Sequence, residues 1–131
     1  KLGPEERGLV IVSSVDPMAV LAGVEGAETV CRELAKTFGA HLAAEGYRRL
    51  AAQCAADEPA RIARFLEEAE QLAQRVGDPL DQTASYQHIY RTRSSRLGEE
   101  ATLRAAEQIK QPLLRGYALL GTAEGQILPH P

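Results

Sequence analysis

The sequence predicts an all-α protein of about six antiparallel helices, paired into repeat-like helical hairpins as an α-solenoid or a bundle. Three observations support this fold class. Apolar residues recur at helical spacing along most of the 131-residue chain, and turns of a few residues, rich in Gly and Pro, separate the segments. The chain is 44% apolar but only 5% aromatic, and it is rich in alanine. Alanine favours helices and lets them pack closely.

The N-terminal segment is the exception to this pattern. Residues 9–12 read LVIV, a β-branched run ended by two serines, which predicts a strand. A lone strand leaves its backbone hydrogen bonds unsatisfied. Residues 1–15 are therefore expected to form an extended arm that docks on a helix or on another chain, with self-association through this arm as a hypothesis. A helical start and the first strand of an α/β unit are the alternatives.

The helical domain is expected to span residues 16–128. Asp16-Pro17 is a typical helix start, and Gly39 ends that helix. Gly23 and Gly26 weaken its middle, so it is expected to break, with a longer helix from about Glu25. Its apolar stripe comprises Val20, Val24, Ala27, Cys31, Leu34 and Phe38.

Four more helices are expected after residue 40, and Gly77-Asp78-Pro79 and Gly98 separate three of them. The first covers residues 41–56, the next two lie on either side of residues 77–79, and segments 99–110 and 112–128 complete the chain. Their expected stripes are Ala43, Tyr47, Leu50 and Cys54; then Ile62, Leu66, Ala69, Ala73 and Val76, widened by Phe65 and Leu72; and finally Leu113, Tyr117, Leu120, Ala123 and Ile127.

An internal similarity connects QLAQRVGDPL (71–80) and RAAEQIKQPL (104–113), which are offset by 33 residues. This is near the ~34-residue period of tetratricopeptide repeats. FLEEAEQLAQRVGDP (65–79) resembles the second helix and exit turn of the divergent tetratricopeptide repeats found in bacterial signalling proteins. QTASYQHIYRTR then stands where the next repeat would begin. The resemblance covers about residues 58–128 and implies a curved scaffold that binds peptides or partner domains without chemistry. HEAT-like pairs or a plain bundle would use the same Ala and Leu pattern.

Charge and composition exclude several classes of function. The net charge of −3 argues against a general attraction to nucleic acid or to an anionic membrane. No apolar run reaches the ~18 residues of a membrane span, and no secretory signal is visible. Cys31 and Cys54 fall at apolar helical positions, which predicts reduced core thiols in a cytoplasmic protein. Because the chain begins at Lys1 rather than Met, we expect a piece of a longer protein.

No motif for catalysis, metal or cofactor is present. The three histidines lack metal-ligand spacing, the serines lack a nucleophile-elbow setting, and the glycines form no phosphate-binding loop. We therefore expect no enzymatic activity, no cofactor and no metal site.

The stretch SYQHIYRTRSSR (85–96) is the candidate partner-binding site. On a helix, Tyr86, Tyr90 and Arg93 lie within about 100° of arc. One interpretation places the tyrosines in the core, with the Arg93 stem along it. The other places Tyr86, Tyr90, Arg93 and Arg96 on a groove wall that grips an acidic peptide or phosphate, and single-stranded nucleic acid is a third.

These observations favour a non-enzymatic protein–protein interaction scaffold. A regulatory helical domain that senses a small molecule is the first alternative, and a nucleic-acid-binding helical domain is the second.

Overall fold

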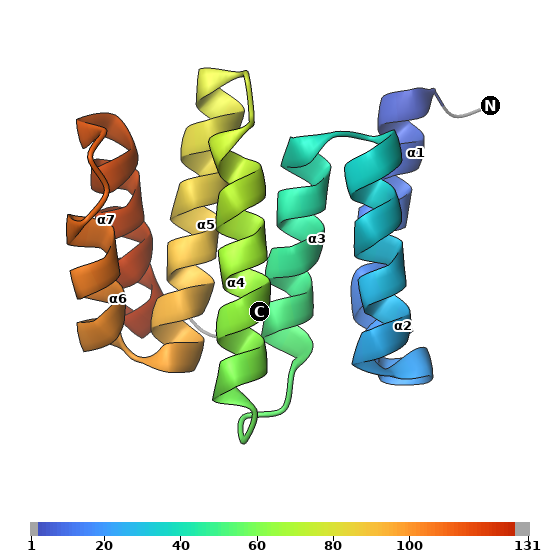
Figure 1. Ribbon diagram of the computed structural model, residues 1–131, viewed down its shortest axis with the longest axis horizontal. Coiled ribbons are helices and arrows are strands. Elements are labelled where there is room, and N and C mark those ends of the chain that lie inside the picture. Colours follow the sequence, from blue (N-terminus) through green and yellow to red (C-terminus); the bar gives the residue numbers. More distant parts are fainter. Residues whose placement is uncertain (1–2, 128–131) are drawn as a thin grey trace.

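The computed structural model describes residues 3–127, and these residues form seven α-helices in a side-by-side array (Figure 1). The helices are α1 (Pro4–Ser13), α2 (Val15–Thr37), α3 (Ala40–Gln53), α4 (Pro59–Gln74), α5 (Pro79–Leu97), α6 (Glu99–Glu107) and α7 (Pro112–Ile127). The all-α prediction is confirmed for this part of the chain, although with one helix more than expected.

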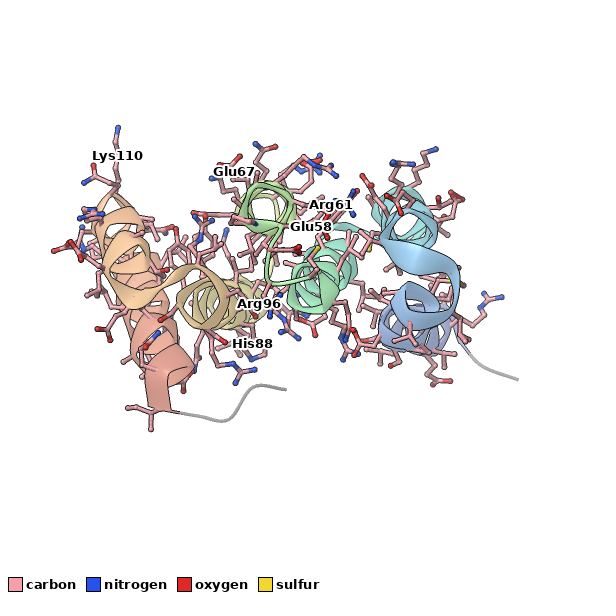
Figure 2. The ribbon with its side chains drawn as sticks, turned by 90° about the horizontal axis from the view of Figure 1, so that it is seen from below. Glu58, Arg61, Glu67, His88, Arg96 and Lys110 are labelled. Carbon is pink, nitrogen blue, oxygen red and sulfur yellow. The ribbon has the colours of Figure 1, made fainter. Side chains whose placement is uncertain are left out.

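The helices lie in two rows. From α1 to α6 each helix packs against the next, and each odd-numbered helix also contacts the next odd-numbered one. Helices α1, α3, α5 and α7 therefore form one row, and α2, α4 and α6 lie along it as a second (Figure 2). Every helix contacts only near neighbours in the chain, as expected from the short turns.

The strand expected over residues 9–12 is wrong, as is the extended arm within residues 3–15; Lys1 and Leu2 lie outside the described residues. The segment is helix α1. Pro4 begins this helix, and the Glu6 carboxylate accepts a hydrogen bond from the Gly3 N–H at 3.0 Å. Val12 is buried in the core that the following helices build, as is Val15 just beyond the end of α1. This tertiary packing overrides the β-branched preference of LVIV.

Helix α2 begins directly after α1 and bends at Gly23, whose φ of 81° is left-handed. The predicted break is thus confirmed. Beyond the bend, Ala27, Cys31 and Leu34 are fully buried, as their stripe predicted. Before it, Val20 is 76% exposed, because this half of α2 has little to pack against.

The core is centred on α3, α4 and α5. Small residues of the predicted stripes, such as Ala43, Ala69 and Ala73, are fully buried, so the helices approach closely. Phe65 and Leu66 fill the interior, and the Tyr47 and Phe65 rings lie 6.2 Å apart.

Helix α5 begins and ends at its predicted signals. The Asp78 carboxylate accepts hydrogen bonds from the N–H groups of Leu80 and Asp81, at 2.9 and 3.1 Å, as an N-cap does. At the other end Gly98 adopts a φ of 102°, which other residues rarely adopt.

Helix α7 is oriented differently from the expectation. The stripe of Leu113, Tyr117, Leu120, Ala123 and Ile127 faces away from α5, and Leu114, Ala118, Gly121, Thr122 and Gly125 are buried instead. The reason is close approach. A Cβ on Gly121 would lie 2.1 Å from the backbone oxygen of Gln87, so only glycine fits at this crossing.

Between residues 3 and 127 no single helix has the length and hydropathy needed to cross a membrane; α1 and α2 reach them only when taken together, with a 60° bend between them.

Candidate functional site

The tyrosines of the predicted site are interior residues. Tyr86 and Tyr90 are 3% and 1% exposed. The Tyr90 hydroxyl donates to the Glu70 carboxylate of α4, at 2.9 and 3.0 Å to its two oxygens. Burial, reinforced by the Glu70 charge, raises the pKa of Tyr90.

The arginines of that stretch bind within the fold. Arg93 Nη2 donates to the same Glu70 carboxylate at 3.1 Å, and its guanidinium lies 5.1 Å from the centre of the Tyr90 ring. Arg96 donates to the backbone oxygen of Cys54 at the end of α3. In this fold SYQHIYRTRSSR therefore joins α5 to α3 and α4, in line with the packing interpretation of the tyrosines. Its use as a binding surface stays a prediction.

A groove on the odd-numbered row is a better candidate site. It has a volume of about 290 Å³ and lies between α1, α3 and α5; we call it the α1–α3–α5 groove. Apolar side chains contribute Leu9, Val12, Leu42, Ala44, Ala84 and Ile89, and polar ones contribute Ser13, His41, Glu45, Arg49, Asp81, Ser85 and His88. Leu9 is 51% exposed at the wall, although it is one of the larger apolar residues of the molecule.

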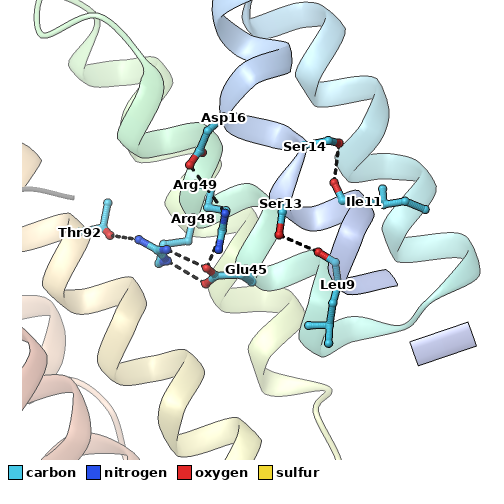
Figure 3. Close-up of polar contacts among 9 residues, drawn as sticks. All are labelled: Leu9, Ile11, Ser13, Ser14, Asp16, Glu45, Arg48, Arg49 and Thr92. Atoms are coloured by element: carbon cyan, nitrogen blue, oxygen red, sulfur yellow. Dashed lines mark hydrogen bonds and ion pairs between the residues drawn. The ribbon is translucent and has the colours of Figure 1, made fainter. Parts of the chain in front are cut away.

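Glu45 organises the polar side of this groove (Figure 3). Its carboxylate accepts two hydrogen bonds from Arg48, at 2.8 and 2.9 Å, and one from Arg49 at 2.8 Å. Arg48 also donates to Thr92 of α5 at 3.1 Å, and Arg49 lies 3.7 Å from Asp16 of α2. This network therefore ties three helices together at one side of the groove.

The electrostatics of Glu45 follow from these contacts. Burial alone would raise its pKa, but the hydrogen bonds and charges of Arg48 and Arg49 outweigh burial and hold the pKa at about 2. Glu45 is thus a fixed anion with its lone pairs occupied. The two arginines it holds are similarly neutralised.

At the other end of the groove His41 bridges α3 and α5. Its Nδ1 lies 3.2 Å from Ser85 Oγ, and its Nε2 lies 3.9 Å from an Asp81 oxygen. The Asp81 side chain is 52% exposed and the His41 ring 42%. An anion therefore stands at this rim with half of its surface open to a partner.

His88 lies one helical turn beyond Ser85 in the groove lining. Burial lowers its pKa, with the nearby Arg48 and Arg91 charges acting in the same direction against Glu45 and Glu124. At neutral pH its ring is therefore an uncharged donor and acceptor.

The Ser85–His41–Asp81 arrangement has the residue types of a hydrolase triad but not the chemistry of one. Ser85 lies inside α5, so its backbone N–H belongs to the hydrogen-bond ladder of the helix. An acyl-transfer site needs N–H groups free to bind an oxyanion beside the nucleophile. The geometry instead suits hydrogen bonding to a partner.

Two other features bear on function less directly. Within residues 3–127, no three or more His, Cys, Asp or Glu side chains are placed to hold a metal ion. Cys31 and Cys54 are both free and buried, and burial, with the Glu28 charge in support, raises the pKa of Cys31 to about 12. The Cys31 thiol is therefore protonated and unreactive at neutral pH.

A second hollow lies on the other row, lined by α2, α3 and α4. It is larger, about 840 Å³, and includes Arg32, Lys36 and Arg75 with Glu68 above Tyr47 and Leu72. Arg32 is paired with Glu28 at 3.2 Å. Because Lys36 and Arg75 lie near the C-terminal ends of α2 and α4, where cations stabilise the helix dipole, this hollow has a structural explanation.

Sequence reasoning missed the α1–α3–α5 groove. Its chemistry depends on pairs such as His41 and Ser85, which are 44 residues apart. The one available signal was the polar spacing Asp81, Ser85 and His88 along a predicted helix, which marks a single face of α5.

We compared the chain with protein-family models, with curated protein sequences and with solved structures, and none of them matches it.

Proposed function

We propose that the protein is a helical-repeat scaffold that binds a segment of a partner protein in the α1–α3–α5 groove. The two rows of helices support a solenoid, because each helix contacts only near neighbours in the chain. The tetratricopeptide-like resemblance of residues 58–128 points to the same class.

The offset of 33 residues also supports a repeat. Pro79 and Pro112 both begin helices, and Ala73 and Ala106 are both fully buried. Gln82 donates to the backbone oxygen of Ala73 at 3.1 Å, and Arg115, 33 residues later, donates to that of Ile109 at 3.1 Å. Each side chain thus reaches back from its helix to the carboxyl end of the helix before it.

The groove carries the proposal. Its apolar patch beside Leu9 and Leu42 accommodates one bulky apolar side chain, and the exposed Asp81 carboxylate favours a cation next to it. Its polar groups are already held by Glu45 and Ser85, so little ordering is needed on binding.

These charges revise the class of partner. An acidic peptide was expected from Arg93 and Arg96, but Glu70 and the Cys54 carbonyl bind those guanidinium groups inside the fold. We now propose a partner segment that carries an apolar residue beside Lys or Arg. At about 290 Å³ the groove lies at the lower limit for drug-sized ligands, so a side chain fits it better than a small-molecule effector.

The test is a selection of random twelve-residue peptides on the immobilised chain, followed by titration calorimetry of those enriched. We expect sequences with a bulky apolar residue next to Lys or Arg, and at least tenfold weaker binding to Asp81→Lys. Asp57→Lys makes the same charge change in the exposed α3–α4 turn and should leave the affinity unchanged. Acidic or purely polar peptides, or equal loss in both variants, would contradict the groove.

A further inference from the structure

Helix α7 presents a second apolar face, opposite the one that packs on α5. Leu113, Leu120 and Ile127 are 56%, 47% and 78% exposed, and they recur every seven residues. Gly116, Tyr117 and Ala123 complete this face, which we call the α7 outer stripe. An apolar helix face of this length is normally covered in a folded assembly.

The α7 outer stripe carries no charge. The only charged residues of α7 are Arg115 and Glu124. Arg115 binds the Ile109 carbonyl, and Glu124 accepts hydrogen bonds from Gln87 of α5 at 2.9 and 3.0 Å. Both are thus engaged within the chain, and a matching surface should be apolar as well.

The order of residues in the stripe is self-complementary. Leu120 lies at its centre, with Leu113 seven residues before and Ile127 seven residues after. If a second α7 packs antiparallel with the two Leu120 side chains facing each other, Leu113 meets Ile127. Tyr117, the largest residue of the stripe, then meets Ala123, one of the smallest.

We propose that two copies of this chain associate through their α7 outer stripes, in an antiparallel two-fold contact centred on Leu120. A two-fold contact uses the same patch twice, which requires the kind of self-complementarity that this stripe has. Gly116 and Ala123 allow the helix axes to approach closely. The proposal replaces the earlier hypothesis of self-association through an N-terminal strand, since that segment is helix α1.

The size of the stripe sets the strength of the contact. A 16-residue helix is about 24 Å long and about 10 Å wide. Its footprint is therefore roughly 250 Å², well below the ~800 Å² per partner of a standard interface. We expect a weak dimer, visible by sedimentation equilibrium between roughly 10 μM and 1 mM.

Sedimentation equilibrium of the whole chain provides the first test. The parent protein should gain mass toward the dimer as its concentration rises, and Leu120→Asp should remain monomeric. Leu80→Asp is the matched control, because Leu80 is 79% exposed on α5; it should dimerise like the parent. A parent that stays monomeric, or a Leu120→Asp variant that still dimerises, would overturn the proposal.

Cysteine cross-linking tests the register. Leu120→Cys should form a disulfide-linked dimer under mild oxidation, whereas Leu113→Cys alone should not, because its two copies lie about 21 Å apart. A mixture of Leu113→Cys and Ile127→Cys chains should cross-link. The native Cys31 and Cys54 are buried and do not compete. Cross-linking of Leu113→Cys alone, as strong as that of Leu120→Cys, would exclude the antiparallel register.

Discussion

Two glycines of α7 set how closely it approaches α5. A Cβ on Gly121 would lie 2.1 Å from the Gln87 backbone oxygen, and one on Gly125 would lie 2.5 Å from that of Arg91. Both neighbours are backbone atoms of a packed helix, so neither can give way cheaply. Glycine costs helix propensity, and here that cost is offset by the close contact it allows.

Substituting Gly121 by Ala should therefore lower the free energy of unfolding by about 3 kcal/mol or more. Gly116 is the matched control on the same helix, because a Cβ there meets nothing within 4 Å. Gly116→Ala should raise stability by about 0.5–1 kcal/mol through helix propensity. Urea denaturation at low micromolar concentration measures both. A Gly121→Ala variant as stable as the parent would mean that α5 and α7 are farther apart than described.

The junction of α3 with α2 and α5 depends on ion pairs rather than on apolar burial. Glu45 receives Arg48 and Arg49, which in turn reach Thr92 and Asp16. Arg48 is only 8% exposed, so removal of its carboxylate partner would leave a buried charge without compensation.

The pH dependence of stability should report on this junction. The pKa of Glu45 is about 2 in the fold against an ordinary 4.5, so the unfolded chain binds the proton more tightly. The stabilisation is complete above about pH 4.5 and is lost as the pH falls toward 2, with a size of about 3 kcal/mol. Glu45→Gln should destabilise strongly at pH 7, and its difference from the parent should shrink toward pH 2.

Glu67→Gln on the exposed face of α4 makes the same change outside this network. Its difference from the parent should stay small at every pH. A Glu45→Gln deficit that is the same at pH 2 and pH 7 would contradict the assignment.

Across the whole molecule, stability should vary along the array. Helix α1 packs only on α2 and α3, and α7 only on α5 and α6, whereas α3 and α5 have neighbours on both sides. Arrays with nearest-neighbour contacts open from their ends.

Hydrogen exchange measured by mass spectrometry should show this gradient. Amides of α3, α4 and α5 should exchange slowest, and those of α1 and of α2 before Gly23 fastest. Exposed Val20 and Leu21 mark the least packed part of α2. Equal protection from α1 to α7 would show a single cooperative unit instead.

Local signals were enough to place most helix ends and much of the core. Asp78, Pro79 and Gly98 delimit α5 as predicted, Gly23 bends α2, and Ala69 and Cys31 are buried on their expected stripes. Capping and backbone freedom act within one helical turn, so a sequence can reveal them directly.

The tertiary structure decided which of the competing faces is covered. LVIV is helical because Val12 packs into the core, and α7 turns Leu120 outward because Gly121 lets its other face approach α5. The α1–α3–α5 groove likewise exists only where His41 meets Ser85 across two helices. Periodicity shows that a segment can bury a face, but the burial itself depends on shape and contacts with residues some 30 to 40 positions away, which local spacing does not encode.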